Sequence, residues 1–270
     1  MNIGAKILFI AYFAVHLTDV ALSGKYQTII LDGPKALSDD IKDTKIVLRI
    51  EGKGALDLLP PSDTGGIVCA DVLMLIDISC SISNKDKQRV RNISALVAHS
   101  LLTSVYPEDP TSFNLARIGV LTYSEKTRHV LYLNNSKSSE EIDKIIRNVE
   151  IRKSKQSLCR TSTHRALSDA RTFFFKSKQN NKQIINLFTD GLTFLRRNRK
   201  ALYREQRKLR EMGVIINVIQ VRHRKGKYEE NEYINLPHTQ NHLFESKDKN
   251  ITSQLIDRLI EDASCANLKA

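Results

Sequence analysis

Hydrophobic and polar positions alternate between strand-like and helix-like spacing along most of the chain. The apolar run at residues 72–76 is continuous, which is typical of a strand buried on both faces of a parallel sheet. The predicted strands are residues 72–76, 116–123, 128–133, 184–189, 214–219 and 242–244. The predicted helices, with apolar residues at helical spacing, are residues 85–104, 139–149, 163–176, 197–212 and a last helix from about residue 251 to 260.

This order predicts an α/β fold with an open, doubly wound, mostly parallel sheet flanked by helices on both faces. Ser83, with Asp86 three residues later, has the pattern of a helix N-cap, and Gly213 stands where a helix C-cap glycine belongs. Ligands of such sheets bind outside the carboxyl ends of the strands. The loops after Ile76 and Thr189, and the loop before the helix at 163–176, are therefore the expected functional loops.

The N-terminal residues have the features of a signal peptide, predicted at residues 1–23. Lys6 precedes an apolar run at residues 7–15, and Ala21-Leu22-Ser23 is a small-x-small cleavage pattern. A buried N-terminal helix is the alternative interpretation. Residues 24–68 are predicted to be an extension and linker with a strand at 45–50, residues 69–265 one domain, and residues 266–270 a tail. No other stretch approaches membrane-spanning length.

Composition and cysteine usage agree with a secreted, extracellular product. Hydrophobic residues make up 41% of the chain, enough for a real core, and the four cysteines suggest disulfides with three possible connectivities. Sequons at Asn92, Asn134 and Asn250 predict glycosylation. Lys and Arg exceed Asp and Glu by 42 to 30, a net charge of +12. This charge favours acidic partners such as sulfated glycans or acidic proteins, or it serves solubility alone.

The three functional loops carry two carboxylates and several hydroxyls. The residues are Asp77, Ser79, Ser81, Thr161 and Asp190. All are hard oxygen ligands, so they predict a Mg²⁺ or Mn²⁺ site with water in the remaining positions and one position open to a carboxylate of a partner. Ordinary loop and cap residues are the alternative interpretation, since Ser and Asp are common there.

This set of residues resembles the metal-ion-dependent adhesion site of the von Willebrand factor A domain family. Asp77, Ser79 and Ser81 match the family's Asp-x-Ser-x-Ser, Thr161 its distant threonine, and Asp190-Gly191 its Asp-Gly after a central strand. The resemblance runs from about Cys69 to Cys265. It implies a non-enzymatic adhesion or extracellular-matrix protein.

Two cysteines depart from the family pattern, which usually places glycine at positions 80 and 159. The paired change suggests a Cys80–Cys159 bond beside the metal, and the resemblance brings Cys265 near Cys69 for a second bond. A strand rises about 3.3 Å per residue, so Cys69 and Cys80 stand at opposite ends of a strand, farther apart than the roughly 7 Å that a disulfide allows. Free thiols at 80 and 159 remain the alternative.

Basic residues cluster next to the metal loops and predict a ligand-binding rim. Arg160 and Arg165 flank Thr161, and a second group follows the Asp190 loop: Arg196, Arg197, Arg199 and Lys200. Such charges would add to the field of the cation and attract anionic ligands. A solvated helix face with its usual charges is the alternative.

These features predict a protein that binds an acidic extracellular protein through a bound ion, without a nucleic-acid partner or a transmembrane span. The sequence has no nucleophile-elbow, zinc-protease or phosphate-loop motif. The alternatives are a structural matrix-assembly component, and a binder of sulfated, heparin-like glycans that works through its basic surface. Metal dependence of binding distinguishes adhesion from both.

Overall fold

A computed structural model describes residues 20–23, 26–29, 68–103, 116–151, 160–176, 181–194, 196–227 and 230–265. The chain divides into two units, Met1–Leu59 and Pro60–Ala270. In the first unit, β1 (Val20–Ser23) and β2 (Tyr26–Ile29) pair antiparallel. β1 lies within the segment predicted as a signal peptide, whose cleavage stays a prediction, and the strand predicted at 45–50 falls outside the described residues.

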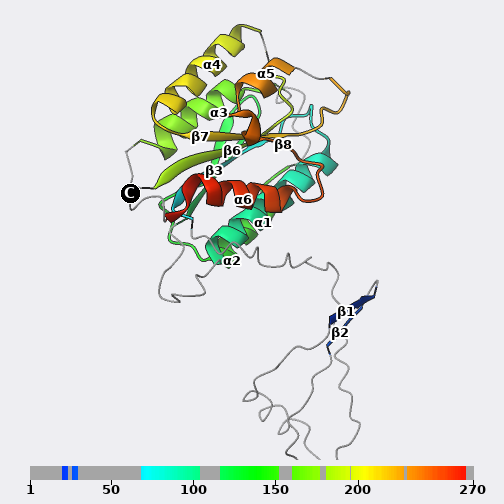
Figure 1. Cartoon of the computed structure of the whole chain (residues 1–270). Coiled ribbons are helices and arrows are strands. Elements are labelled where there is room, and N and C mark those ends of the chain that lie inside the picture. The colour runs from blue at the N-terminus through cyan, green and yellow to red at the C-terminus, as the bar shows by residue number, and fades with distance from the viewer. Residues whose placement is uncertain are drawn as a thin grey trace, which may run out of the picture. The chain divides into compact units, whose positions relative to one another are not determined.

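The second unit is built on a six-stranded sheet with the order β5-β4-β3-β6-β7-β8 (Figure 1). All neighbouring strands are parallel except β4 and β5. The strands are β3 (Ala70–Asp77), β4 (Arg117–Tyr123), β5 (Thr127–Leu131), β6 (Lys182–Thr189), β7 (Ile215–Gln220) and β8 (Leu243–Glu245). The predicted open, mostly parallel α/β sheet is confirmed.

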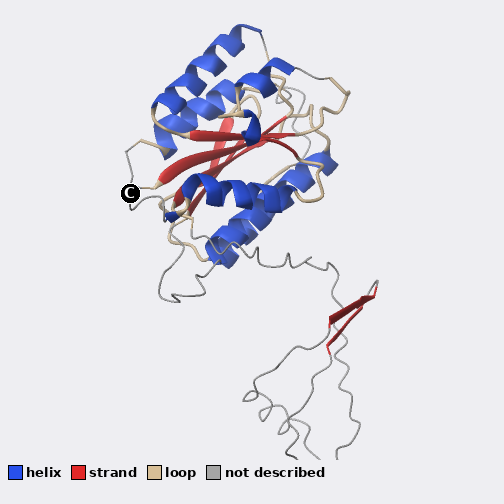
Figure 2. Ribbon diagram, viewed as in Figure 1, coloured by secondary structure: helices blue, strands red, loops and turns tan. Residues whose placement is uncertain are grey.

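Helices cover both faces of the sheet, and each face has its own hydrophobic core (Figure 2). Successive side chains of a strand point to opposite faces, so Met74 of β3 packs in one core while Leu73 and Leu75 pack in the other. The first core includes residues of α1 (Asn84–Thr103), α2 (Ser139–Arg147) and α6 (Ile251–Ala263). The second includes residues of α3 (Thr163–Asp169), α4 (Arg196–Glu211) and α5 (Glu230–Asn235).

Two helix ends form as their sequence predicts. The Ser83 hydroxyl accepts the Asp86 N–H at 3.1 Å and donates to the Asp86 carboxylate at 2.6 Å, just before α1 begins at Asn84. Gly213 follows α4 with a φ of 81°, the left-handed conformation that ends many helices. These caps fix where α1 leaves the carboxyl end of β3 and where β7 begins.

The helix predicted at 163–176 changes geometry halfway. α3 ends at Asp169, and Ala170–Phe174 form a π-helix in which the Phe175 N–H donates to the Ala170 carbonyl at 3.0 Å. The wider turn rotates the following side chains, so Phe175 is 1% exposed and Phe173 is 47% exposed. Regular helical spacing over residues 163–176 predicts Phe173 on the same buried face as Ala166 and Ala170, and the π-helix is the reason why this prediction is wrong.

The remaining helices are short and were not apparent in the sequence pattern. α5 and the 3-10 helix Gln240–His242 contain few apolar residues, and tertiary packing of Tyr233 holds α5 against the sheet. Within the described ranges, no helix combines the length and the apolar character that a bilayer crossing requires.

Candidate functional site

The parallel strands β3 and β6 bring two aspartates to the same edge of the sheet. Asp77 is the last residue of β3, Asp190 directly follows β6, and the two strands are hydrogen-bonded neighbours. Thr161 stands just before α3 and its carbonyl accepts the Phe194 N–H of the Asp190 loop at 2.8 Å. The three loops that the sequence selects therefore meet at one place.

Hydroxyl groups connect the loop after β3 to the loop before α3. The Ser79 and Ser81 oxygens lie 2.7 Å apart, and the Thr161 hydroxyl donates to the Ser79 Oγ at 3.1 Å. The Ser79 N–H donates to Asp77 Oδ1 at 2.8 Å. Four of the predicted ligand residues are thus linked in one network of hydrogen bonds, with Asp190 beside it.

Each aspartate has one oxygen with a partner and one without. The Leu192 N–H donates to Asp190 Oδ1 at 3.2 Å, as the Ser79 N–H does to Asp77 Oδ1. The second oxygens, Asp77 Oδ2 and Asp190 Oδ2, are buried and have no hydrogen-bond partner among the residues that the structure describes. Native proteins leave few buried polar atoms unpartnered, so these two oxygens point to a group that the protein chain does not supply.

The pKa values of the two aspartates also reflect the missing partners of their carboxylates. Burial, and then repulsion by the Asp190 carboxylate, raise the pKa of Asp77 well above its usual range. Burial also raises the pKa of Asp190, while the nearby Ser81 hydroxyl and the Leu192 N–H oppose that rise. A nearby cation would remove the penalty on both ionised carboxylates.

The donor set suits a hard divalent cation. Carboxylate and hydroxyl oxygens are the ligands that Mg²⁺ and Mn²⁺ take, and the two carboxylates together match the charge of one such ion. No group of three or more His, Cys, Asp or Glu side chains that could hold a metal occurs in the described part of the chain. A site at this edge therefore depends on the serine and threonine hydroxyls as well as the acids.

Gly191 shapes the turn that follows Asp190. Its φ is 70°, a conformation that side-chain-bearing residues rarely adopt, and a Cβ placed there would lie 2.7 Å from the Tyr233 ring. The Gly191 N–H also donates to the Thr189 hydroxyl at 3.1 Å. The glycine thus lets the chain turn tightly under α5 and place Asp190 toward Asp77.

The predicted rim residues fall into different environments. Arg160 is exposed, lies over the Phe194 ring at 4.9 Å and forms an ion pair with Glu125 at 3.3 Å. Arg165 is exposed and donates to the Glu125 carbonyl at 3.1 Å. Phe194, which the sequence did not single out, is 39% exposed beside Thr161. This part of the rim offers both positive charge and an apolar surface.

The second group of predicted rim residues lies at the start of α4. Lys200 is exposed, whereas Arg199 is directed inward, with Nε 3.7 Å from the Glu232 carboxylate. The side chains of Arg196 and Arg197 lie outside what the structure describes. Arg199 therefore interacts with the protein's own buried acid as well as standing near the rim.

Two basic residues at this edge escaped the sequence analysis. Lys87 of α1 is only 1% exposed and interacts electrostatically with Asp77. Arg224 follows β7, and its N–H donates to the Ser81 carbonyl at 2.6 Å. The signals were present: Lys87 precedes the buried Val90 by three residues on one helix face, and residues 222–227 are a basic run just past the end of β7.

Glu232 of α5 is a buried acid that also escaped sequence analysis. Its carboxylate accepts the Thr193 N–H at 3.2 Å and the Thr193 hydroxyl at 3.0 Å. The Thr193 hydroxyl in turn lies 3.2 Å from the Thr163 hydroxyl of α3. Burial raises the pKa of Glu232 to about 7, against these hydrogen bonds and the attraction of Arg199. Glu232 thus connects α5 to the loop that follows Asp190.

Replacing Glu232 with glutamine should stabilise the protein above pH 7. The raised pKa means that the Glu232 contribution to stability is full below its usual value of 4.5 and is lost as pH rises through about 7. The Gln variant keeps an acceptor for the Thr193 N–H without the buried charge. At pH 8 it should be more stable than wild type by about 3 kcal/mol, and at pH 4 equally stable. Urea denaturation across this pH range measures the difference.

Glu205→Gln is the matched control because the net shift of that buried glutamate has the opposite sign. Burial raises the pKa of Glu205, but the hydrogen bond and the charge of Arg171 lower it by more than burial raises it. The net shift of the pKa is therefore downward. Glu205→Gln should therefore destabilise the protein at neutral pH. A Glu232→Gln variant that loses stability at pH 8 would contradict the role assigned to burial.

The three cysteines that the structure describes are bonded. Cys69 and Cys265 form a disulfide across a sequence separation of 196 residues, the pair that the family resemblance implies. Cys80 is disulfide-bonded as well, and its partner lies outside the described residues, as does Cys159. The sequon residues Asn92, Asn134 and Asn250 are all exposed, so each is accessible to glycosylation, which stays a prediction.

Comparison with known proteins identifies similar domains. The family model described as von Willebrand factor type A domain matches residues 71–258. No match was found among curated protein sequences. A solved structure of proximal thread matrix protein 1 from the mussel byssus superposes with a TM-score of 0.57 at 19% identity, over 72% of this chain and 48% of that one. The chain thus spans about half the length of the mussel protein.

Two further similar structures contain a metal ion. The mussel protein with a zinc-occupied MIDAS motif matches with a TM-score of 0.55 at 23% identity, over 72% of this chain and 47% of that one. The manganese-loaded TRAP protein of Plasmodium vivax matches with a TM-score of 0.55 at 17% identity, over 74% of this chain and 75% of that one. At these identities the similarity shows the fold.

Proposed function

The chain belongs to the von Willebrand factor type A domain family, whose model matches residues 71–258, and on this premise we propose that it is a secreted, non-catalytic adhesion or matrix-binding protein. It holds Mg²⁺ or Mn²⁺ at the carboxyl edge of the sheet and binds an acidic extracellular protein there. The proposed metal ligands are Asp77, Ser79, Ser81, Thr161 and Asp190. The bound ion supplies positive charge and a coordination position that a carboxylate of the partner can take.

The two orphaned carboxylate oxygens carry this proposal. Within the described part of the chain, Asp77 Oδ2 and Asp190 Oδ2 are buried without a hydrogen-bond partner, at the carboxyl ends of the neighbouring strands β3 and β6. Leaving such atoms unsatisfied is costly, and one divalent cation satisfies both. Backbone N–H groups of Ser79 and Leu192 hold the other oxygens, so the free ones are already oriented.

The surroundings of the site suit an acidic protein ligand. Arg160, Arg165 and Lys200 are exposed near the metal edge, and Phe194 adds an exposed apolar ring between them and Thr161. Positive charge around a cation steers anionic partners toward it. An aromatic side chain at the rim supplies contact area that a purely electrostatic site lacks.

Secretion is supported by the covalent chemistry of the domain. The Cys69–Cys265 disulfide requires an oxidising compartment to persist. Asn92, Asn134 and Asn250 are exposed, as glycosylated asparagines must be. The apolar segment at residues 7–15 is the proposed targeting signal.

We assign Cys159 as the partner of the bonded Cys80. Cys80 lies between the two serines of the proposed metal site, and Cys159 precedes Thr161 by two residues. A bond between them ties two loops that supply metal ligands. Such a tie favours one conformation of the site, so its ligand affinity should respond little to conformational switching.

Binding to immobilised matrix proteins in Mn²⁺ and in EDTA tests the proposed function. Wild-type protein should bind at least one acidic matrix protein in Mn²⁺ and lose that binding in EDTA. Asp190→Ala should behave in Mn²⁺ as the wild type does in EDTA, because Asp190 is a proposed ligand of the ion. Asp257→Asn, which removes an exposed carboxylate from α6, is the control and should bind normally.

The same assay separates the other candidate functions. Binding that is equal in Mn²⁺ and EDTA but falls steeply with salt would indicate recognition of sulfated glycans by the basic surface. Self-association without any matrix ligand would indicate an assembly component. Either result would contradict metal-dependent adhesion.

A further inference from the structure

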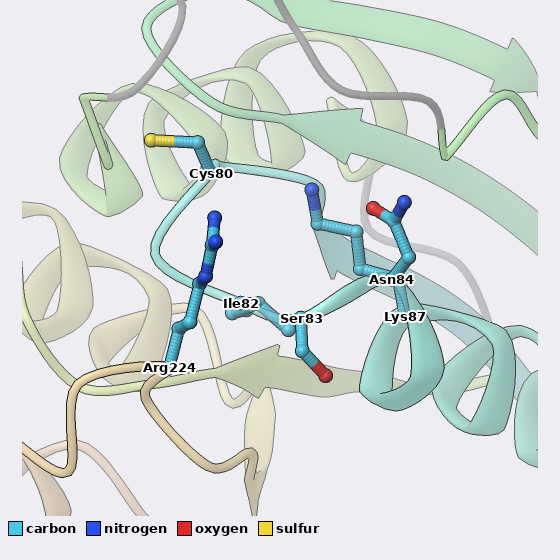
Figure 3. A pocket seen from close by; sticks show the side chains of 6 residues that line it. All are labelled: Cys80, Ile82, Ser83, Asn84, Lys87 and Arg224. Carbon is cyan, nitrogen blue, oxygen red and sulfur yellow. The ribbon is translucent and has the colours of Figure 1, made fainter.

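A pocket of about 250 Å³ opens beside the proposed metal loop. Its lining comes from the loop between β3 and α1, from the start of α1, and from the loop after β7 (Figure 3). The lining residues are Cys80, Ile82, Ser83, Asn84, Lys87 and Arg224. No acidic side chain is among them, and two of them are cations.

Lys87 forms the buried wall of this pocket. The residue is 1% exposed, and the electrostatic attraction of Asp77 acts on its ammonium group. Figure 3 shows the ammonium group pointing away from the α1 backbone, toward the chain that leads to Cys80. Burying an ammonium group is energetically unfavourable unless anions approach it, and an anion in the pocket would add to the attraction of Asp77.

Arg224 supplies a second charge from a different element. Its N–H donates to the Ser81 carbonyl at 2.6 Å, and an isolated antiparallel bridge joins His223 to Ile82. These contacts attach the loop after β7 to the metal loop, so the Arg224 position is fixed by backbone bonds. Its side chain is exposed, and Figure 3 shows its guanidinium and the Lys87 ammonium pointing in the same direction.

The nearby acids do not neutralise this pair of cations. Asp86 is engaged by the Ser83 hydroxyl at 2.6 Å and by Arg89 at 3.6 Å. Asp77 attracts Lys87, but its charge belongs to the proposed metal site and is offset when an ion is bound there. The positive end of the α1 dipole adds to the field, since α1 is 20 residues long and begins at the pocket.

We infer that this pocket is a second anion site, which takes a carboxylate of an acidic peptide whose neighbouring carboxylate binds at the metal edge. The inference rests on the proposed function for the first carboxylate. Cys80 of the pocket lies in sequence between Ser79 and Ser81, so one short peptide can reach both places. The pocket is small and Lys87 lies deep in it, which suits a single carboxylate on a thin side chain. A sulfated glycan would instead use an extended exposed surface.

Synthetic peptides with defined acidic residues test this inference at saturating Mn²⁺. One series carries two glutamates separated by zero to three glycines, and a reference peptide carries a single glutamate. The best two-glutamate peptide should bind wild-type protein about tenfold more tightly than the reference, since one charge-assisted contact is added. Lys87→Met and Arg224→Gln should each abolish most of that advantage, measured as the ratio of the affinities of the two-glutamate and reference peptides for the same variant. The ratio is used because Lys87 also interacts with Asp77 of the proposed metal site.

Lys225→Gln is the matched control, because it removes the same charge from the same loop outside the pocket. An equal loss of the advantage in Lys225→Gln and Arg224→Gln would overturn the inference, since it would reflect net charge alone. The absence of any two-glutamate advantage, or an advantage that survives in Lys87→Met, would also overturn it. The inference would also be overturned if heparin fragments bound in the pocket and no acidic peptide did.

A metal-free measurement separates failure of the pocket from failure of the proposed function. In EDTA, inorganic sulfate should shift the amide resonances of Ser83 and Arg224 in wild-type protein and leave them unchanged in Lys87→Met. A sulfate response without binding of the reference peptide in Mn²⁺ would support the pocket as an anion site. It would contradict the proposed binding of a carboxylate at the metal edge. The absence of a sulfate response in wild-type protein would overturn the assignment of the pocket as an anion site.

Discussion

Replacing Asp77 with asparagine is expected to reverse the order of stability between metal-free and metal-loaded protein. In EDTA at pH 7 the variant should be more stable than wild type by about 2 kcal/mol, because it lacks a buried charge with an orphaned oxygen. Asparagine still accepts the Ser79 N–H that Asp77 accepts. With the ion at about 100 times its dissociation constant, wild type should gain about 2.7 kcal/mol and the variant nothing.

The pH dependence of this effect has a definite sign. Burial and the Asp190 carboxylate raise the pKa of Asp77. A raised folded-state pKa contributes stability that is full at low pH and is lost as pH rises through the folded-state value. In EDTA, the advantage of Asp77→Asn should therefore shrink toward acid pH, where wild-type Asp77 is already neutral.

Urea denaturation and isothermal titration with Mg²⁺ or Mn²⁺ check this prediction together. Asp257→Asn is the control, because the same chemical change at an exposed position of α6 should alter neither stability nor metal binding. Metal binding by Asp77→Asn with the affinity of wild type would contradict the assignment of Asp77 as a ligand. A variant less stable than wild type in EDTA would contradict the account of the orphaned carboxylate.

Removing the Cys69–Cys265 disulfide should cause a large loss of stability without loss of metal binding. The bond closes a loop with a sequence separation of 196 residues, and loops of this size restrict the unfolded chain strongly. The Cys69→Ala/Cys265→Ala double variant should lose about 4 kcal/mol. Alanine is chosen because Cys69 is buried and a serine hydroxyl there would add a separate penalty.

The position of the bond explains why metal binding should survive. The Cys69 N–H donates to the Ala263 carbonyl at 2.9 Å, next to a bridge between Val68 and Ser264. These residues join the start of β3 to the end of α6, at the opposite end of β3 from Asp77. Denaturation in EDTA measures the stability, and titration measures the ion. A loss of stability under about 1 kcal/mol would contradict the loop-closure account. Loss of metal affinity in the folded variant would contradict the independence of the two ends of β3.

Local sequence patterns were enough to predict the fold class and the edge of the sheet at which the candidate metal residues lie. Periodicity is a local property, and a buried parallel strand such as β3 must be apolar on both faces, so its pattern is visible without tertiary contacts. Asp77 and Asp190 follow such strands directly, and strand ends of a parallel sheet meet at one edge. Caps such as Ser83 and Gly213 are equally local, and both form as expected.

Which charged side chains are exposed and which are buried became clear from the packing of the elements. Arg199 was predicted at the ligand rim, but the unpredicted α5 places Glu232 3.7 Å from it. Lys87 shares a helix face with Val90 in the sequence pattern, but only the packing of α1 on the sheet buries it beside Asp77. The loop after β7 gains its position from a bridge to Ile82, a contact between segments far apart in sequence. Burial and long-range pairing depend on how elements pack together, and a local pattern does not contain that information.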